Sequence, residues 1–268
     1  MIDNYQKHAK EIRRNILKMV AFSKAAHIGS ALSVVDILTV LYFKILKIKP
    51  NQPDWSDRDR LIFSKGHAAT ALYSTLVQRG FASKDCLENY YGDGTKLAGH
   101  PIRGCLPGIE VSTGSLGHGL PIGLGITMSD KYDKKSSRTF VILSEGDCDE
   151  GSNWEAAMMA SQLKLDNLIA IVDYNKIQAM GRVKDIIDLE PFKDKWESFG
   201  WSVEEINGHD FEQIEKSLIN IPFKKNKPSV VIAHTIKGKG VSFMEDSLIW
   251  HYQYPNEEQL KQALAELK

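Results

Sequence analysis

Segments of strand length alternate with helical segments through the second half of this chain, and this alternation constrains the fold more than any other feature. Strands are expected at Thr139–Leu143, Leu168–Val172, Ser202–Ile206 and Ser229–Ala233. Strands that alternate with helices form a parallel sheet whose two faces are covered by those helices. The sequence therefore predicts an α/β fold, with a doubly wound, mainly parallel sheet and helices on both faces.

The first half of the chain adds two helices and a further strand to this prediction. Apolar residues recur at helical spacing between Ile12 and Val20, and Val34–Leu46 is expected to be a second helix. A short strand at Arg60–Phe63 and a helix at Ala68–Gln78 follow. The chain has 268 residues and no repeat, low-complexity tract or linker. We therefore expect a single domain that spans residues 1–268.

Composition excludes several classes of function. Thirty-four Lys and Arg balance thirty-four Asp and Glu, and no basic run stands out, which argues against a nucleic-acid partner. The most apolar region, Val34 to Ile48, is interrupted by charged residues and is too polar to span a membrane. The amphipathic N-terminus lacks the apolar core of a signal peptide, and three cysteines without metal spacing favour a reducing compartment. We expect a cytoplasmic protein with no membrane contact.

Polar residues follow two of the expected strands, within the stretch Arg138–Gly181. The first strand ends in Ser144-Glu145-Gly146, and the next ends in Asp173-Tyr174-Asn175-Lys176-Ile177. Ligands of open α/β sheets bind beyond the carboxyl ends of the strands. A carboxylate and an amide oxygen at that edge can hold a hard divalent cation that also binds phosphate. A glycine at position 146 would let backbone N–H groups approach such a phosphate, and a helix starting near Asn153 would point its positive end at it.

Several sequence blocks, in order along nearly the whole chain, resemble the N-terminal, diphosphate-binding half of transketolases, in particular those split into two polypeptides. Each block alone is weak, and their order makes the resemblance specific. The blocks are Lys24–Ser33, Ser64–Ser74, Gly99–Pro101, Leu106–Leu120, Glu150–Ala157, Asp173–Gln178 and His234–Asp246. The resemblance implies the thiamine-diphosphate-binding fold of the diphosphate (PP) domain type.

The resemblance also implies roles for the histidines of these blocks. His27 and His100 match histidines that contact the sugar substrate and move protons, and His67 matches a ligand of the diphosphate. His251 matches a histidine between diphosphate and substrate. The family usually has glycine after that histidine, whereas this chain has Tyr252.

The remaining cofactor and metal positions follow in the same way. Gly114, Ser115 and Leu116 resemble the loop beside the two rings of thiamine diphosphate. The resemblance further implies that Asn175 coordinates the metal through its side chain and Ile177 through its backbone carbonyl. The expected metal is Mg²⁺, or Ca²⁺.

The acidic metal ligand depends on the register of one motif. The family has Gly-Asp-Gly, and Gly146-Asp147-Cys148 matches it superficially. Alignment on Glu150-Gly151 and Trp154-Glu155-Ala156 instead places Ser144-Glu145-Gly146 on the motif and gives the family's spacing of thirty residues to Asn175. The expected ligand is Glu145, with Asp147 as the fallback. Glutamate moves the carboxylate by about 1.5 Å, one C–C bond, and Mg²⁺ tolerates such a shift less well than Ca²⁺.

The resemblance implies a partner chain. Glu150 and Glu155 match glutamates at the family's subunit interface, in contact with the partner's cofactor-activating region. The family's activating glutamate belongs to a pyrimidine-binding domain, which we expect on a separate C-terminal subunit, with the two chains assembled as an α2β2 tetramer. The glycine-rich run Lys237-Gly238-Lys239-Gly240 could touch phosphate, but it is expected to be a mobile, solvated loop.

The leading functional prediction is therefore a subunit of a thiamine-diphosphate- and metal-dependent transketolase, which transfers a two-carbon ketol unit between sugar phosphates or activated sugars. A related thiamine reaction, such as 1-deoxyxylulose-5-phosphate synthesis, is an alternative. A non-catalytic scaffold with a decayed cofactor site is another, because Glu145 and Tyr252 depart from the family pattern. The donor and acceptor sugars stay open.

Overall fold

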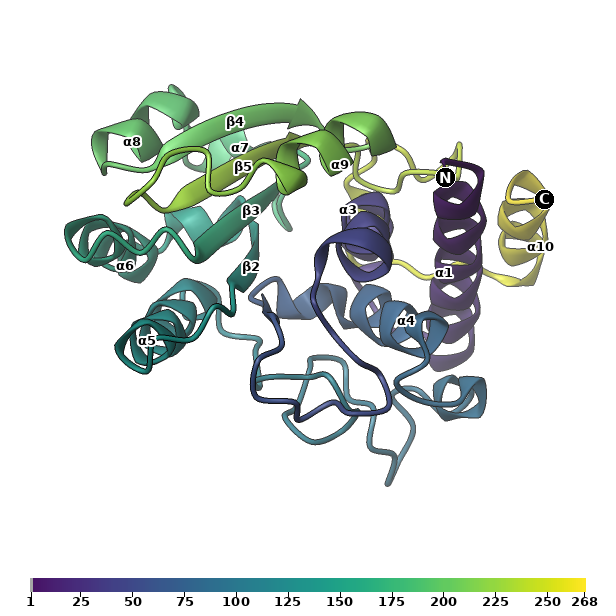
Figure 1. Ribbon diagram of the computed structural model, residues 1–268. Helices are drawn as coiled ribbons and strands as arrows, with labels where there is room; N and C mark the ends of the chain where they lie inside the picture. The colour runs from purple at the N-terminus through teal and green to yellow at the C-terminus, as the bar shows by residue number, and fades with distance from the viewer. Residues whose placement is uncertain (1) are drawn as a thin grey trace.

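A five-stranded, fully parallel sheet forms the centre of the protein (Figure 1). The computed structural model describes residues 2–268. The strands run in the order β1-β2-β3-β5-β4. Their bounds are Arg60–Phe63 (β1), Thr139–Ser144 (β2), Leu168–Tyr174 (β3), Ser202–Asn207 (β4) and Ser229–His234 (β5). All the strands predicted from the sequence are confirmed, and each is extended by no more than one or two residues.

Helices cover both faces of the sheet, as predicted. In Figure 1, the helices α1, α3, α4 and α10 of one group lie to the right, and α5, α6 and α8 of the other lie to the left. The first group comprises α1 (Ile2–Ser23), α2 (Ile28–Ser33), α3 (Val35–Val40), α4 (Ala69–Arg79), α9 (Phe211–Ile219) and α10 (Glu257–Glu266). The second comprises α5 (Gly119–Tyr132), α6 (Gly151–Gln162), α7 (Val183–Ile186) and α8 (Phe192–Ser198).

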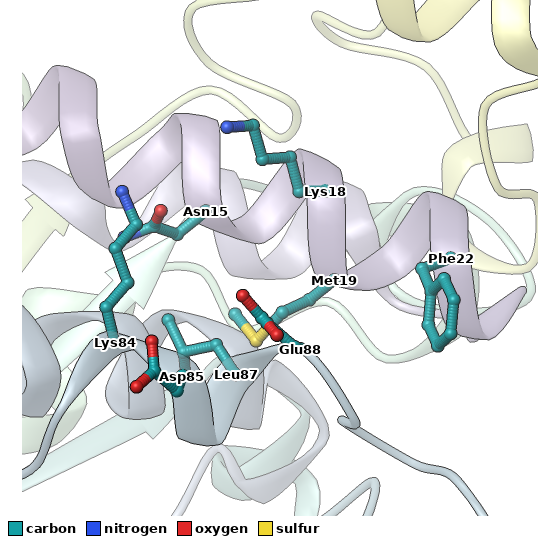
Figure 2. Close-up of a pocket in the computed structure, with 8 residues that line it drawn as sticks. All are labelled: Asn15, Lys18, Met19, Phe22, Lys84, Asp85, Leu87 and Glu88. Carbon is teal, nitrogen blue, oxygen red and sulfur yellow. The ribbon is translucent and has the colours of Figure 1, made fainter.

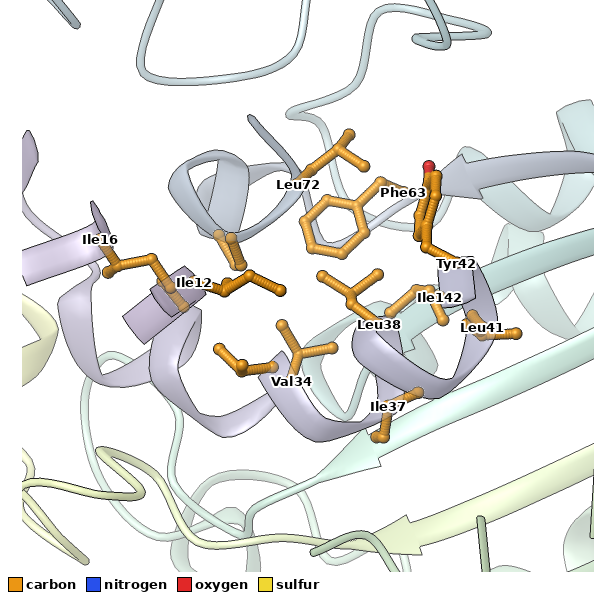
Figure 3. Packing of buried hydrophobic residues seen from close by; sticks show 14 of the residues in the cluster. Ile12, Ile16, Val34, Ile37, Leu38, Leu41, Tyr42, Phe63, Leu72 and Ile142 are labelled. Carbon is orange, nitrogen blue, oxygen red and sulfur yellow. The ribbon is translucent and has the colours of Figure 1, made fainter. Parts of the chain in front are cut away.

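The alternation of side chains along β2 and β3 creates the two cores. Phe140 and Ile142 pack into one buried cluster, whereas Val141 and Leu143 pack into the other. Successive side chains of a strand point to opposite faces, so a strand buried on both sides reads as a continuous apolar run. Figure 3 shows the first cluster, in which side chains of α1, α3, α4, β1 and β2 interdigitate.

The helix expected at Val34–Leu46 is confirmed in outline but changes geometry midway. It consists of α3 followed by one wider π-type turn, η1, at Leu41–Ile45. Four further single turns of 3-10 helix interrupt the loops, at Gly66–Ala68 (η2), Lys84–Leu87 (η3), Gly146–Asp149 (η4) and Ile249–His251 (η5). Within residues 2–268, no helix has the length and apolar character needed to cross a membrane.

Glycines in α5 allow this helix to lie directly against the sheet. A Cβ atom at Gly119 would overlap the Cβ of Ser64, and one at Gly123 would lie 2.7 Å from a methyl group of Val141. Gly125, in contrast, faces open space. The close approach places the Gly114–Leu116 loop, which leads into α5, beside the end of β1. It thereby brings that loop to the sheet edge where the expected ligands lie.

Candidate active site

A cavity of about 250 Å³ opens at the carboxyl ends of β2 and β3. Most of the residues predicted for the site line it: His27, His67, Gly114, Leu116, Glu145, Gly146, Asn175, Ile177 and His251. Its other lining residues are Ser30, Lys65, Ser144, Gln178 and Ala179. Four of the predicted residues, Ser115, His100, Glu150 and Glu155, do not line this cavity, and all four are exposed. Segments far apart in sequence therefore converge on one edge of the sheet, as the topology requires.

A larger depression of about 380 Å³ lies elsewhere, between α1 and η3 (Figure 2). Its walls carry Lys18, Phe22, Lys84 and Glu88. Phe22 is 69% exposed, and none of the predicted site residues reaches this depression. The residues predicted for the site gather instead around the smaller cavity at the strand ends.

Glu145 and Asn175 direct their side-chain oxygens to the same backbone amide. The N–H of Ile177 lies 3.2 Å from Glu145 Oε1 and 3.1 Å from Asn175 Oδ1. Glu145 is only 2% exposed, and its Oε2 is buried without a hydrogen-bond partner. A buried carboxylate oxygen without a partner is costly, unless a cation completes the site. These oxygens fit the donor set of a hard divalent ion, although no cluster of three or more His, Cys, Asp or Glu in residues 2–268 forms a cation site by itself.

Burial affects the protonation of Glu145. Desolvation raises its pKa to about 7, against the opposing charge of Lys65. A cation beside the carboxylate would favour the ionised form.

Asp147 is placed differently. Its Oδ1 accepts hydrogen bonds from Ser64 Oγ (2.6 Å) and the Gly117 amide (3.0 Å). Its Oδ2 accepts from the amide and the hydroxyl of Ser144, both at 2.9 Å. Both oxygens are thus occupied, the side chain is fully buried, and it does not line the cavity. Asp147 ties the end of β2 to the loops before α4 and α5, and the geometry favours Glu145 as the residue that faces a ligand.

The start of α6 contributes less to the cavity than the sequence suggested. The helix begins at Gly151, after the turn η4, and no residue of its first turn is among those that line the cavity. Gly146, at the start of η4, faces the cavity instead, where a Cβ atom would lie 3.3 Å from a methyl group of Leu116. The loop at Gly146, rather than the first turn of α6, therefore lines the cavity.

Histidine rings gather around the mouth of the cavity. The ring of His27 lies 4.9 Å from that of His251, 5.4 Å from that of His67 and 6.2 Å from that of His100, measured between ring centroids. His27 has a left-handed backbone (φ 74°), and its N–H donates to the carbonyl of His251 at 2.7 Å. This contact fixes the loop before α2 against η5.

These histidines are held neutral. Burial, together with nearby positive charges, lowers the pKa of His27 to about 4 and that of His251 to about 3. Burial also lowers the pKa of His67 well below its usual value. A neutral imidazole carries one N–H and one lone pair, so each ring can donate one hydrogen bond and accept another.

Lys237 lies at the same site, although the sequence indicated a mobile, solvated loop. That expectation is wrong: Lys237 is completely buried. Its Nζ lies 3.0 Å from the carbonyl oxygen of Ile177 and 2.8 Å from Nδ1 of His251. Burial, followed by the charge of Lys65, lowers the pKa of Lys237 to about 8. The ammonium therefore adds a positive charge beside the carbonyl that was predicted as a metal ligand.

A second buried lysine was missed by the sequence reasoning. Lys65 forms an ion pair with Asp173, and both side chains are fully buried. Lys65 Nζ also donates to the Ser30 carbonyl at 3.0 Å, and Asp173 accepts from Ser33 Oγ at 2.6 Å and from Thr235. The pair joins the ends of β1, β3 and β5 to α2, underneath the cavity. Lys65 lies inside one of the family-like blocks, which was the available signal.

Comparison with known proteins identifies the family to which this chain belongs. Residues 4–265 match the family described as "Transketolase, thiamine diphosphate binding domain". One subunit of the apulose-4-phosphate transketolase of Phocaeicola vulgatus is 42% identical over 266 residues, which cover 99% of this chain and 94% of that protein. The 6-deoxy-6-sulfo-D-fructose transketolase subunit SqwG of Clostridium sp. is 40% identical over 263 residues, which cover 98% of this chain and 96% of that protein.

Solved transketolase structures share the fold. The transketolase of Campylobacter jejuni superposes with a TM-score of 0.94 at 35% identity, covering 100% of this chain and 43% of that one. The enzyme of Leishmania mexicana gives a TM-score of 0.92 at 29% identity, covering 98% of this chain and 41% of that one. The chain belongs to the transketolase family, as the thiamine-diphosphate-binding, N-terminal type of subunit. The predicted family, fold and enzyme class are thereby confirmed.

Proposed function

We propose that this chain and a second subunit together form a metal- and thiamine-diphosphate-dependent enzyme that moves two-carbon ketol units between sugars. Within it, residues 1–268 act as a single diphosphate-binding domain. The observation that carries the proposal is the cavity at the strand ends, where the unpartnered Oε2 of Glu145 lies with Asn175 Oδ1 among neutral histidines.

Glu145, Asn175 and the carbonyl of Ile177 would hold Mg²⁺, or Ca²⁺, against the diphosphate. All three supply oxygen, which both ions prefer. His67 and the backbone around Gly146 would contact the diphosphate itself, and the buried ammonium of Lys237 would add a positive charge there.

When bound, thiamine diphosphate supplies the nucleophilic carbon and the electron sink that carbon–carbon bond cleavage in a ketose requires. The chain's own residues orient the reactants and move protons. His27, His100 and His251 would bind the hydroxyl groups of the sugar and accept or return its protons, because their rings lie together at the mouth. Gly114, Ser115 and Leu116 would lie beside the rings of the cofactor, and Gly114 and Leu116 form that wall of the cavity.

The partner would be a C-terminal transketolase subunit with the pyrimidine-binding domain, in an α2β2 assembly. The names of the relatives support a partner, because the proteins described above are named as single subunits of transketolases. Its docking surface would include the exposed face of α6, where Glu155 lies next to Met158 and Met159, which are 53% and 44% exposed. Glu150 is exposed at the start of the same helix.

The substrates would be phosphorylated or otherwise activated ketoses and aldoses used in a specialised sugar pathway, in the cytoplasm. The relatives are named for apulose 4-phosphate and for 6-deoxy-6-sulfo-D-fructose. In this chain Tyr252 follows His251 and is 62% exposed, with its ring 4.9 Å from the histidine ring. A bulky ring beside a proposed substrate-binding histidine supports a restricted choice of substrate.

Reconstitution tests the proposal. The chain is purified alone and with a pyrimidine-domain subunit from the same genome, and each sample is titrated with thiamine diphosphate and Mg²⁺ and assayed over a panel of ketose phosphates. We expect ketol transfer by the complex and none by the chain alone. A complex that leaves millimolar thiamine diphosphate unbound would support a non-catalytic scaffold, and decarboxylation of pyruvate in place of ketol transfer would support the 1-deoxyxylulose-5-phosphate synthase alternative.

A further inference from the structure

The Nζ of Lys237 contacts Ile177 and His251, two residues that line the cavity, and other residues bind the backbone before and after Lys237. The loop follows β5, and the buried ammonium lies 3.0 Å from the Ile177 carbonyl. The lysine stem is long and flexible, so the position of its charge depends on the backbone that carries it. The side chains that hold this backbone, His209 and Arg13, are not among the residues that line the cavity.

His209 binds the residue before Lys237. Its Nε2 accepts a hydrogen bond from the backbone N–H of Ile236 at 2.8 Å. Its Nδ1 lies 2.8 Å from Oδ2 of Asp36. An ionised carboxylate can only accept, so Nδ1 must carry the proton and Nε2 is left as the acceptor that the Ile236 amide needs. Asp36 thereby fixes the tautomer of His209.

Arg13 binds the second residue after Lys237. Its Nε donates to the carbonyl of Lys239 at 3.0 Å. Its two terminal nitrogens donate to the two oxygens of Asp36, at 2.8 and 2.7 Å. A bidentate pair of this kind fixes the plane of the guanidinium group as well as its position. Both side chains that bind the loop, His209 before Lys237 and Arg13 after it, are therefore held by the carboxylate of Asp36.

Asp36 is well suited to be this common anchor. It is 4% exposed and lies in the first turn of α3. Burial opposes its ionisation, but the charge of Arg13 and the bond from His209 outweigh burial and lower the pKa to about 2. The carboxylate is therefore ionised throughout the neutral and mildly acidic range.

The loop also packs directly onto α2. The amide of Gly238 donates to the carbonyl of Gly29 at 2.9 Å. A Cβ atom at position 29 would lie 3.0 Å from Cγ of Lys237. There is thus little room for the lysine stem to shift toward α2, and the hydrogen bonds from His209 and Arg13 further restrain the loop.

We propose that Arg13, Asp36 and His209, the Asp36 cluster, are positioning residues that hold Lys237 against the diphosphate end of the cofactor site. None of the three lines the cavity. The inference rests on the proposed cofactor site and deepens it, because it assigns a function to an ion-pair cluster that would otherwise be only structural.

A double-mutant cycle tests the proposal. His209→Phe, Lys237→Met and the double variant are each prepared in the complex with the partner subunit, and thiamine diphosphate binding with Mg²⁺ is measured by calorimetry. His209→Phe leaves the bidentate Arg13–Asp36 pair intact, so the fold is expected to persist. Loss of such a supporting contact weakens binding by about ten-fold. In the Lys237→Met background the same substitution should change the affinity less than about two-fold, because the charge it positions is gone.

Two further variants test whether a change in affinity comes from a general disturbance of the structure. His234→Phe makes the same substitution two residues before Ile236, in a side chain whose ion pair with Glu205 is long (3.9 Å) and exposed, and it should leave the affinity unchanged. His209→Gln can still accept from the Ile236 amide, so it should recover part of the lost affinity. It also provides the test if the phenylalanine variant does not fold.

The outcomes separate the two proposals. If the wild-type complex binds thiamine diphosphate, and His209→Phe weakens binding equally with and without Lys237, the positioning role is wrong and the proposed function stands. The same holds if neither His209 variant changes the affinity. If the wild-type complex does not bind the cofactor at all, the proposed function fails, and the positioning role fails with it.

Discussion

Glu145 and Ile177 are joined by a hydrogen bond of 3.2 Å from the Ile177 amide to Oε1, which leaves Oε2 of the same buried carboxylate without a partner. The turn after β3 thus holds the carboxylate in place through Oε1 but provides no hydrogen bond to Oε2. A bound cation is the simplest source of the missing interaction, since hard divalent ions take carboxylate and amide oxygens.

Replacement of Glu145 by glutamine tests this arrangement. Glu145→Gln keeps the size of the side chain but removes its charge, so the Mg²⁺-dependent affinity of the complex for thiamine diphosphate should fall by about ten-fold or more, as when a metal ligand or its direct support is lost. Calorimetry in the presence of Mg²⁺ and of Ca²⁺ measures the effect. Glu197→Gln, an exposed glutamate on α8, is the matched control. Equal affinities for Glu145→Gln and the wild type would remove Glu145 from the metal site.

The neutral histidines make the free energy of unfolding depend on pH. The pKa of His27 is lowered from 6.5 to about 4, chiefly by burial. Between these values the unfolded chain binds a proton that the folded chain does not, so the free energy of unfolding falls as the pH falls from about 6.5 toward 4, by at most about 1.4 kcal/mol per pH unit for one group.

His27→Asn should make this pH dependence shallower. Asparagine tolerates the left-handed backbone at this position, so the substitution adds little strain. Urea unfolding of the isolated chain at pH 7 and pH 5 gives the comparison. An equal loss of stability in the variant and the wild type would show that His27 is not the titrating group.

The buried Lys65–Asp173 ion pair predicts that removing one charge destabilises the protein more than removing both. Lys65→Met leaves Asp173 buried without its counter-charge, which costs about 3–5 kcal/mol. The double variant Lys65→Met, Asp173→Asn removes both charges and should recover part of that loss. Chemical denaturation measures both. A single variant as stable as the wild type would contradict the assigned pairing.

Two glycines of α5 form a matched pair for the packing of this helix on the sheet. Gly119→Ala forces a methyl group into Ser64 and should destabilise the protein by about 1–3 kcal/mol. Gly125→Ala faces open space and should be neutral or stabilising by up to about 1 kcal/mol, because alanine favours helix. Thermal unfolding distinguishes them. The same effect from both substitutions would argue against the close approach of α5 to β1.

The sequence was most informative where local pattern decides structure. The apolar runs of β2 and β3 are buried on both faces, so their composition alone indicates strands. The sequence also led to a choice between Glu145 and Asp147 for the acidic motif. In the structure, both carboxylate oxygens of Asp147 accept hydrogen bonds, whereas Glu145 lines the cavity.

What the sequence did not indicate depends on contacts between distant residues. Lys237 lies in a glycine-rich, charged run that is typical of a solvated loop, and its burial comes from α2 and the turn at Ile177. Lys65 and Asp173 are 108 positions apart, and nothing local marks either as half of an ion pair. Conversely, Ser115 and His100 belong to family-like blocks yet do not line the cavity in this chain.

An anomalous-scattering measurement on crystals of the complex with thiamine diphosphate and Mn²⁺, used in place of Mg²⁺, tests the central claim most directly. We expect one strong manganese peak within coordination distance of Glu145 and Asn175, with the Ile177 carbonyl as a third protein ligand. A peak on Asp147, or cofactor bound with no peak beside Glu145, would contradict the account.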